Sequence, residues 1–496
     1  MNAKIRRLAV GLLVCYVALF VQLNLIQAGP RQQELTEHPR NDRQTLRDFN
    51  RPRGAIVTAD GRIVAHSVPT TDPNAQFEYQ REYPLNELFA NVTGYYTFNY
   101  GSTQLERTHS DVLAGKTAEQ QLQGLGGIFE GEDNTGTVVL TMRADLQQLA
   151  KDLLAEREGS VVVMEPSTGK ILAMYSHPTY DPNLVAVHDS EEAGNVLLFL
   201  TNFPGKPLLA NAYQERYMPG SAFKVITTGI ALETGATSLE RSWPSETEWV
   251  PPQTNDPIQN YGGTSCGGPM VEVFARSCNI PFAQLAVEIG PDLMVTGTEL
   301  WGIGEPIPID LPGPVASSFG ESDFFRDNLP LLAIGGFGQG NDLMVPLHMA
   351  MVAGTVANGG RMMEPYVVDT TRFHDGNVLD RTEPEVWKTP ISASTAGTLS
   401  LLMTAVVNDG TGRTMQLDNG VQAAAKTGTA QLNGPGEPER SHAWIIGFAP
   451  VEQPRYAVAV ILRGTTDEIS ASTGGVLAGP IAKELLDYLF VTDGLP

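Results

Sequence analysis

A serine and a lysine three positions apart, Ser221 and Lys224, carry the groups needed for nucleophilic catalysis. Pro219-Gly220 disfavours a helix before them, and the sequence from Ser221 to Glu233 (SAFKVITTGIALE) predicts one that begins abruptly. Residues three apart share a helix face, and a serine in the first turn lies near unpaired N–H groups at the positive end of the dipole. A lysine amine kept neutral by burial and positive neighbours can then take the serine proton. The structural alternative is a helix-capping serine followed by a surface lysine.

Two further short patterns supply groups that such a pair would need. Ser277-Cys278-Asn279 precedes a helix predicted from Pro281 to Ile289, so it is expected on a loop. Lys426-Thr427-Gly428 lies in a strand-like segment from Val421 to Ala430. Each pattern occurs once in the chain. A helix cap is the alternative for the first and an ordinary strand lysine for the second, but their order and contexts favour one shared site.

A second Ser-x-x-Lys sequence, Ser167 to Lys170, shows why context matters. It falls in a Pro-Ser-Thr-Gly turn between strands predicted over 160–164 and 170–176. Such a turn does not hold the two side chains on one helix face. We therefore predict that this pair is not catalytic.

The elements around these motifs predict an α+β fold. Consecutive strands combined with helices indicate an antiparallel sheet with helices packed on it. The strands are expected over 421–430, 443–448 and 456–462, and the helices over 143–156, 344–358, 392–408 and 476–490.

Together these residues resemble the active-site motifs of the penicillin-binding proteins and serine β-lactamases. The resemblance is most extensive to the class B penicillin-binding proteins and covers most of the chain from residue 50 onward. It implies a serine-type D,D-transpeptidase that cross-links peptidoglycan stem peptides ending in D-Ala-D-Ala, releases the terminal D-Ala and is acylated by β-lactams. The further segments that carry it are Arg53-Gly54-Ala55-Ile56 with Asp60-Gly61, Glu165 to Lys170, Gly336 to Gly340 and Ala357 to Gly360.

The resemblance also implies a role for each motif residue. Ser221 would attack the carbonyl of the penultimate D-Ala, and Lys224 would take its proton. Ser277 would relay a proton toward the leaving amine with help from Lys426. The Asn279 amide would bind the substrate backbone and help to orient Lys224.

The strand motif would hold the substrate. Lys426 would supply positive potential for the terminal carboxylate, and the hydroxyls of Thr427 and Thr429, on either side of Gly428, would bind it. The backbone N–H groups of Ser221 and Thr429 would form the oxyanion hole, where one donor is worth about 3–4 kcal/mol in other enzymes.

The chain has three cysteines, Cys15, Cys266 and Cys278. Cys15 lies in an apolar segment, whereas the other two are close in sequence and could form a disulfide if the domain lies outside the cytoplasm. A nucleophilic thiol at Cys278 is the alternative. The resemblance favours the disulfide, because in the family this position points away from the serine.

An apolar segment from Leu8 to Ile26 follows a basic N-terminal stretch, MNAKIRR. At about 1.5 Å per residue it is just long enough to cross a hydrocarbon core of about 30 Å. The basic residues predict a cytoplasmic stub over 1–7, a single-pass membrane anchor over 8–28 and an extracytoplasmic remainder. A cleaved signal peptide is the alternative, but no small-x-small cleavage site follows.

Beyond the anchor, two domains are predicted. Residues 29–150, polar at first and then rich in strand and turn signals, are expected to form a smaller β-rich, non-catalytic domain. Residues 151–496 are expected to form the transpeptidase domain. Residues 29–136 contain no glycosyltransferase motif. The resemblance therefore implies a membrane-embedded glycosyltransferase partner, together with other cell-wall and division proteins.

Composition excludes other functions. The net charge of −23 argues against nucleic-acid binding, which requires clustered Lys and Arg. There is no Gly-rich phosphate loop and no His pair at zinc-ligand spacing, so no cofactor and no metal are predicted. A D,D-carboxypeptidase is the alternative with the same chemistry, and a β-lactam-binding sensor or scaffold is the alternative from another class. No recognisable acidic motif supports the deacylating water of a β-lactamase.

Overall fold

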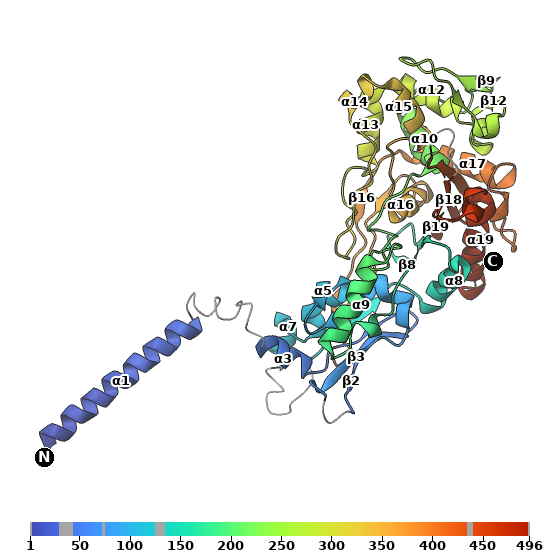
Figure 1. Cartoon of the computed structure of the whole chain (residues 1–496). Coiled ribbons are helices and arrows are strands. Elements are labelled where there is room, and N and C mark those ends of the chain that lie inside the picture. The colour runs from blue at the N-terminus through green and yellow to red at the C-terminus, as the bar shows by residue number, and fades with distance from the viewer. Residues whose placement is uncertain (1, 29–42, 72–74, 125–133, 434–439, 495–496) are drawn as a thin grey trace. The chain divides into compact units, whose positions relative to one another are not determined.

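A computed structural model describes residues 2–28, 43–71, 75–124, 134–433 and 440–494, and Figure 1 shows its elements along the chain. It divides into two compact units, Met1–Pro52 with Pro69–Tyr79, and Arg53–Val68 with Gln80–Pro496. The polar start of the predicted N-terminal domain, residues 29–42, lies outside the described residues.

The first unit contains the predicted anchor. A single helix, α1 (Asn2–Ala28), includes a 23-residue apolar segment from Ala3 to Leu25 that is long enough to cross a membrane. Its described side chains are exposed, as a lipid-facing surface requires. A short helix, α3 (Arg43–Phe49), ends where the Phe49 ring packs against Phe77 at 5.0 Å between centroids.

The second unit contains a six-stranded sheet in the order β15-β14-β6-β1-β2-β3. The segment around Asp60-Gly61 forms a hairpin of antiparallel β1 and β2. Two strands of this sheet, β14 and β15, come from much later in the chain, and β14 pairs antiparallel with β6. The strands are β1 (Ile56–Val57), β2 (Ile63–Pro69), β3 (Tyr79–Glu82), β6 (Thr137–Leu140), β14 (Val368–Arg372) and β15 (Val378–Arg381).

The strand signals predicted to continue from this hairpin to about Gly136 were wrong over much of that segment, which forms mainly short helices. Gly and Asn end helices as readily as strands, and Gly94, with φ of 73°, ends α4. The spacing of turn residues therefore did not distinguish short helices from short strands. The elements are η1 (Asn86–Phe89), α4 (Ala90–Thr93), β4 (Tyr96–Thr97), β5 (Gly101–Ser102), α5 (Gln104–Thr108), α6 (Ser110–Leu113) and α7 (Ala118–Gly124).

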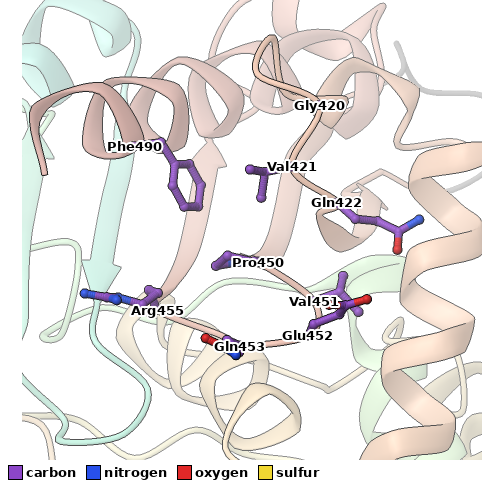
Figure 2. A pocket seen from close by; sticks show the side chains of 9 residues that line it. All are labelled: Gly420, Val421, Gln422, Pro450, Val451, Glu452, Gln453, Arg455 and Phe490. Atoms are coloured by element: carbon purple, nitrogen blue, oxygen red, sulfur yellow. The ribbon is translucent and has the colours of Figure 1, made fainter. Parts of the chain in front are cut away.

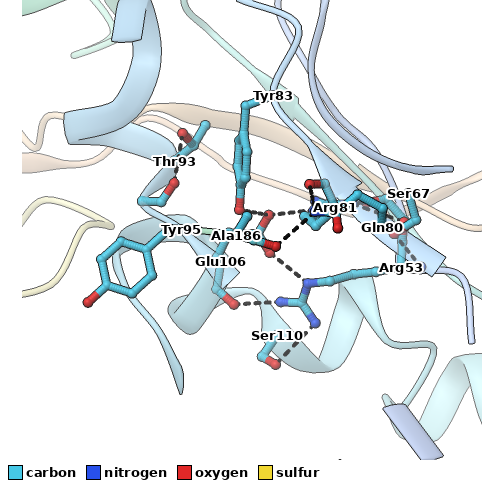
Figure 3. Close-up of polar contacts among 12 residues, drawn as sticks. Arg53, Ser67, Gln80, Arg81, Tyr83, Thr93, Tyr95, Glu106, Ser110 and Ala186 are labelled. Atoms are coloured by element: carbon cyan, nitrogen blue, oxygen red, sulfur yellow. Dashed lines mark hydrogen bonds and ion pairs between the residues drawn. The ribbon is translucent and has the colours of Figure 1, made fainter. Parts of the chain in front are cut away.

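A buried ionic cluster joins the strands and helices of this region (Figure 3). The Glu106 carboxylate accepts from Arg53 Nε at 2.6 Å, from Arg81 Nε at 2.7 Å and from the Tyr83 hydroxyl at 3.2 Å. Burial alone would raise the pKa of Glu106, but the two guanidinium groups lower it overall. The carboxylate is thus charged and satisfied, and removing either arginine would leave a buried charge poorly compensated.

The second sheet has five antiparallel strands in the order β17-β18-β19-β7-β8, and their side chains are almost all buried. It brings the three predicted C-terminal strands next to the predicted hairpin. The strands are β7 (Gly159–Met164), β8 (Ile171–His177), β17 (Ala424–Gln431), β18 (Ser441–Ala449) and β19 (Tyr456–Leu462).

Helices cover both faces of this sheet. Gly354 of α16 (Pro346–Ala357) lies near Met164 and Ala457, whereas Gly479 of α19 (Gly474–Thr492) lies near Ile445. Ile445 pairs with Val460, and side chains alternate along a strand, so the two helices lie on opposite faces. This arrangement confirms the predicted antiparallel sheet flanked by helices.

The predicted boundary at residue 150 stays a prediction. α8 (Ala144–Leu154) runs across that boundary, and it packs against β8 of the second sheet and against α19.

Candidate active site

Ser221 lies on a tight turn that is held against the edge strand β17. A 3₁₀ turn, η3 (Gly220–Phe223), leads into α10 (Lys224–Glu233), so the predicted helix begins as a 3₁₀ turn. The indole N–H of Trp444 donates to the Met218 carbonyl at 2.9 Å, which fixes the chain just before the turn. A Cβ atom at Gly428 would lie 2.5 Å from the Pro219 carbonyl oxygen, so glycine is required for this close approach.

Lys224 is fully buried beside the loop that contains Ser277. Its amine donates to the carbonyl oxygens of Ser277 and Cys278, each at 2.8 Å, and to Asn279 Oδ1 at 2.9 Å. Burial lowers its pKa well below the usual value, and the charge of Lys426 lowers the pKa further. A lowered pKa favours the neutral amine, which is the state that accepts a proton.

Lys426 is the second fully buried lysine, and it lies on β17. Its amine donates to Ser277 Oγ at 2.8 Å and to the Thr427 carbonyl at 3.1 Å, while Lys224 Nζ lies 3.4 Å from the same Ser277 hydroxyl. Burial lowers the pKa of Lys426 to about 7. Ser277 has a φ of 62°, a strained conformation for serine, and its hydroxyl contacts both lysines.

The two lysines are stabilised without a carboxylate partner among the described residues. Instead, Lys224 Nζ lies 5.1 Å from the Phe282 ring centroid, and Lys426 Nζ lies 5.7 Å from that of Phe274. Aromatic faces attract cations weakly, so they offset only part of the desolvation of a charged amine.

We expect Lys426→Met to raise the free energy of unfolding at and below about pH 7. The native pKa is about 7 against 10.5 for a free lysine, so between these values the unfolded state binds more protons. Across that window the stability of the unmutated protein rises with pH relative to the variant, and above about pH 10.5 the difference disappears. Urea titrations of both proteins at about pH 6, 8 and 10 measure this difference. A difference that does not change with pH would contradict the lowered pKa.

Asn260 anchors the Ser277–Asn279 loop and was not predicted from the sequence. Its side-chain oxygen accepts from the backbone N–H of Asn279 at 2.8 Å and of Ile280 at 3.2 Å. Its side-chain nitrogen donates to the carbonyls of Glu246 and Thr264. An asparagine before a Tyr-Gly-Gly turn has no motif that marks it, so only the folded arrangement reveals this role.

A disulfide between Cys266 and Cys278 also holds the loop. Cys266 begins β12 (Cys266–Pro269), and Cys278 lies between Ser277 and Asn279. The disulfide therefore restrains the Ser277–Asn279 loop by joining Cys278 to β12.

Thiol labelling of the folded, unreduced and detergent-solubilised protein is expected to modify Cys15 alone, since Cys266 and Cys278 are joined. The double variant Cys266→Ala/Cys278→Ala should lose about 2–3 kcal/mol of unfolding free energy. It should also be acylated more slowly, because the loop between the lysines is less restrained. Peptide maps with and without reductant measure the pairing, and a free thiol at Cys278 without reductant would overturn it.

The edge strand β17 and the turn that carries Ser221 line one side of a cleft of about 820 Å³. Ser221, Ser277, Asn279, Thr427 and Thr429 all line it. Thr427 Oγ1 lies 2.6 Å from Thr411 Oγ1, and Thr429 Oγ1 accepts from the Gly474 N–H at 3.4 Å. Ser221 is half-buried, and its hydroxyl makes no hydrogen bond with the residues the structure describes. The Ser221 hydroxyl is therefore accessible to a molecule in the cleft.

A second cavity, of about 410 Å³, lies where the chain enters β17 and at the β18–β19 turn (Figure 2). None of the predicted site residues lines it, and the described residues that line it include no Ser, Cys or Lys. The cleft at Ser221 is therefore the candidate active site.

The second Ser-x-x-Lys pair lies in the predicted turn and not on a helix. Ser167 is exposed in the turn between β7 and β8, and Lys170 forms an ion pair with Asp369 at 2.9 Å. Among the described residues, no group of three His, Cys, Asp or Glu side chains could hold a metal ion.

Comparison with known proteins gives a consistent match. Residues 159–487 match the penicillin binding protein transpeptidase domain, and residues 53–139 match the penicillin binding protein A dimerisation domain. The peptidoglycan D,D-transpeptidase PbpA of Mycolicibacterium smegmatis is 38% identical over 97% of this chain and 98% of its own. PbpA of Mycobacterium tuberculosis is 36% identical over 98% of this chain and 99% of its own.

Solved structures agree with this match. Penicillin-binding protein A from M. tuberculosis, as a ceftriaxone acyl-enzyme complex, superposes with a TM-score of 0.83 at 33% identity. The alignment covers 89% of this chain and 99% of that one. The penicillin G acyl-enzyme complex of the same protein gives a TM-score of 0.80 at 34% identity, over 88% of this chain and 99% of the other.

Proposed function

Since the chain belongs to the class B penicillin-binding proteins and is a peptidoglycan D,D-transpeptidase, we propose that Ser221 carries the acyl group of the donor stem peptide. The observation that carries this proposal is the position of Ser277 Oγ between two buried lysine amines, at 2.8 and 3.4 Å, in the cleft that Ser221 lines. Burying two amines this close together is costly, and such clusters occur where proton transfer is needed.

In acylation, Ser221 Oγ attacks the carbonyl carbon of the penultimate D-Ala, and the C–N bond to the terminal D-Ala breaks. The serine proton passes to Lys224 Nζ, and the leaving amine receives a proton through Ser277 Oγ. The lowered pKa of Lys224 supports its role as base, because a neutral amine has the required lone pair. The contacts of Ser277 with both lysines support its role as relay.

The edge strand binds the other end of the donor. Thr427 and Thr429 bind the terminal carboxylate through their hydroxyls, and Lys426 supplies the positive potential. The backbone N–H groups of Ser221 and Thr429 stabilise the oxyanion. Support for this arrangement comes from the cleft lining: among the described residues it includes Ser221 and both threonines but no Asp or Glu side chain.

The acyl group is transferred to the amine of a second stem peptide, which regenerates Ser221. A D,D-carboxypeptidase would transfer it to water instead. Incubating the purified protein with a D-Ala-D-Ala donor and an amine acceptor, followed by mass spectrometry, separates the two. Cross-linked product with one D-Ala released per bond is expected, and hydrolysed donor alone would indicate a carboxypeptidase.

We further infer that the N-terminus is cytoplasmic and the catalytic unit extracytoplasmic. The apolar helix α1 fits a single-pass anchor, and the basic residues before its apolar segment support this orientation. Protease added to intact spheroplasts should digest the catalytic unit, and protection would contradict the orientation.

Glycan polymerisation is then supplied by a membrane-embedded glycosyltransferase partner. Residues 53–139 match a dimerisation domain, which supports a non-catalytic role for that part of the chain. Polymerisation of lipid-linked disaccharide by the purified chain alone would overturn this proposal.

A further inference from the structure

The outer edge of β17 is the side on which a peptide can add as another strand. One side of β17 pairs with β18, and alternate residues direct their N–H and C=O groups to the other side. Contacts made on that outer side identify these residues. Lys426 Nζ contacts the Thr427 carbonyl there, and the Gln339 side chain contacts Thr429 and Gln431.

The Gln339 amide hydrogen-bonds to the backbone N–H and C=O groups of Gln431 on this outer edge. With its nitrogen toward the Gln431 carbonyl, it donates to that oxygen at 3.2 Å and accepts from the Gln431 N–H at 3.1 Å. In the opposite amide orientation, Nε2 would instead donate to the Thr429 carbonyl oxygen at 3.5 Å, so Gln339 bonds either to Gln431 or to Thr429. A neighbouring strand residue would make the same pair of bonds with Gln431, so the side chain occupies the position of a peptide group.

The loop that carries Gln339 is fixed to the nucleophile turn. Gly338 and Gly340, on either side, both have φ of 78°, a conformation that favours glycine. The Gly338 carbonyl accepts from the Gly220 N–H at 2.9 Å. A Cβ atom at Gly338 would lie 2.1 Å from the Gly220 carbonyl oxygen, so the contact requires glycine. The amide is thus presented by a constrained loop rather than by a freely moving one.

We propose that Gln339 caps the free edge of β17 and restricts strand pairing by the donor to Thr429. Gln339 is therefore a residue that determines specificity for donor length. The proposal rests on the proposed function, in which β17 binds the donor, and takes the donor to bind there as an added antiparallel strand. If the penultimate residue of an antiparallel donor lies opposite Thr429, the residue that lies opposite Gln431 is two positions nearer to the donor's N-terminus. It can form those bonds only by displacing the Gln339 amide.

The test compares a short donor, N-acetyl-D-Ala-D-Ala, with a donor extended by two α-linked residues. Acylation is measured as kcat/KM for release of the terminal D-Ala. In the unmutated protein the extension should change this value little. In Gln339→Ala the extension should raise kcat/KM about 5- to 25-fold, since one or two backbone hydrogen bonds become available at about fivefold each.

Two further variants identify the cause. Gln339→Met keeps the bulk of the side chain but lacks the amide, and it should show the same preference for the long donor. The double variant Gln339→Ala/Gln431→Pro lacks the Gln431 N–H on the outer edge, where proline is tolerated, and should lose most of the gain.

The outcomes are distinguishable. If Gln339→Ala lowers kcat/KM equally for both donors, the side chain only supports the loop. If it lowers kcat/KM more for the long donor, the side chain binds substrate. Either result would overturn the proposal that Gln339 caps the free edge of β17. Failure of the unmutated protein to release D-Ala from either donor would instead contradict the proposed function.

Discussion

Ser221→Ala is expected to abolish the covalent penicillin adduct and to reduce transpeptidation by about 10⁴-fold or more, because no other group can carry the acyl intermediate. The side chain makes no hydrogen bond in the described structure, so the variant should unfold at the same temperature as the unmutated protein. The measurement is labelling with a fluorescent penicillin, with the adduct mapped by mass spectrometry.

Ser167→Ala is the matched control, since it removes the serine of the second Ser-x-x-Lys sequence from an exposed turn. It should label like the unmutated protein. An adduct on any residue other than Ser221, or equal labelling of Ser221→Ala, would contradict the assignment of the nucleophile.

Lys224→Met is expected to slow acylation by about 10²–10⁴-fold, which is the usual contribution of a general base. Methionine keeps much of the buried volume, so the fold should be retained, and removal of a buried amine relieves a desolvation cost. Stopped-flow acylation by a chromogenic β-lactam measures the rate. Lys170→Met, at the part-buried pair with Asp369, is the control and should leave the rate unchanged.

The pH dependence of acylation follows from the same pKa. The rate should rise with pH as Lys224 loses its proton, and burial with the charge of Lys426 moves this rise below the usual lysine pKa. Lys426→Met removes the repulsive charge, so the rise should move to higher pH as well as lowering the rate. A rise that stays at the same pH in Lys426→Met would show that the two amines are not coupled.

The parts of the site that could be predicted were those fixed by local sequence. Ser221 and Lys224 are connected by a single turn, and Lys426 to Thr429 lie consecutively on one strand, so spacing and strand type were informative. The sheet that carries them was predictable because its last three strands follow one another in the chain.

Other features depend on contacts between distant segments. Asn260 acts on the Ser277–Asn279 loop through hydrogen bonds that no local pattern encodes, and the contact of Gln339 with Gln431 joins segments about 90 residues apart. The strands β14 and β15 were likewise missed as members of the N-terminal sheet, since their alternation says nothing about which sheet they join.

The insertion of β14 into that sheet has a consequence for synthesis of the chain. β1 and β6 can pair as soon as residue 140 has been made, but the other edge of β6 is covered only when residues 368–372 arrive. Until then the nascent chain exposes an unpaired strand edge, which is prone to pairing with other chains. A protein shortened before residue 368 would retain that edge permanently. We therefore expect the N-terminal sheet, although encoded first, to be among the last parts of the second unit to reach its final structure.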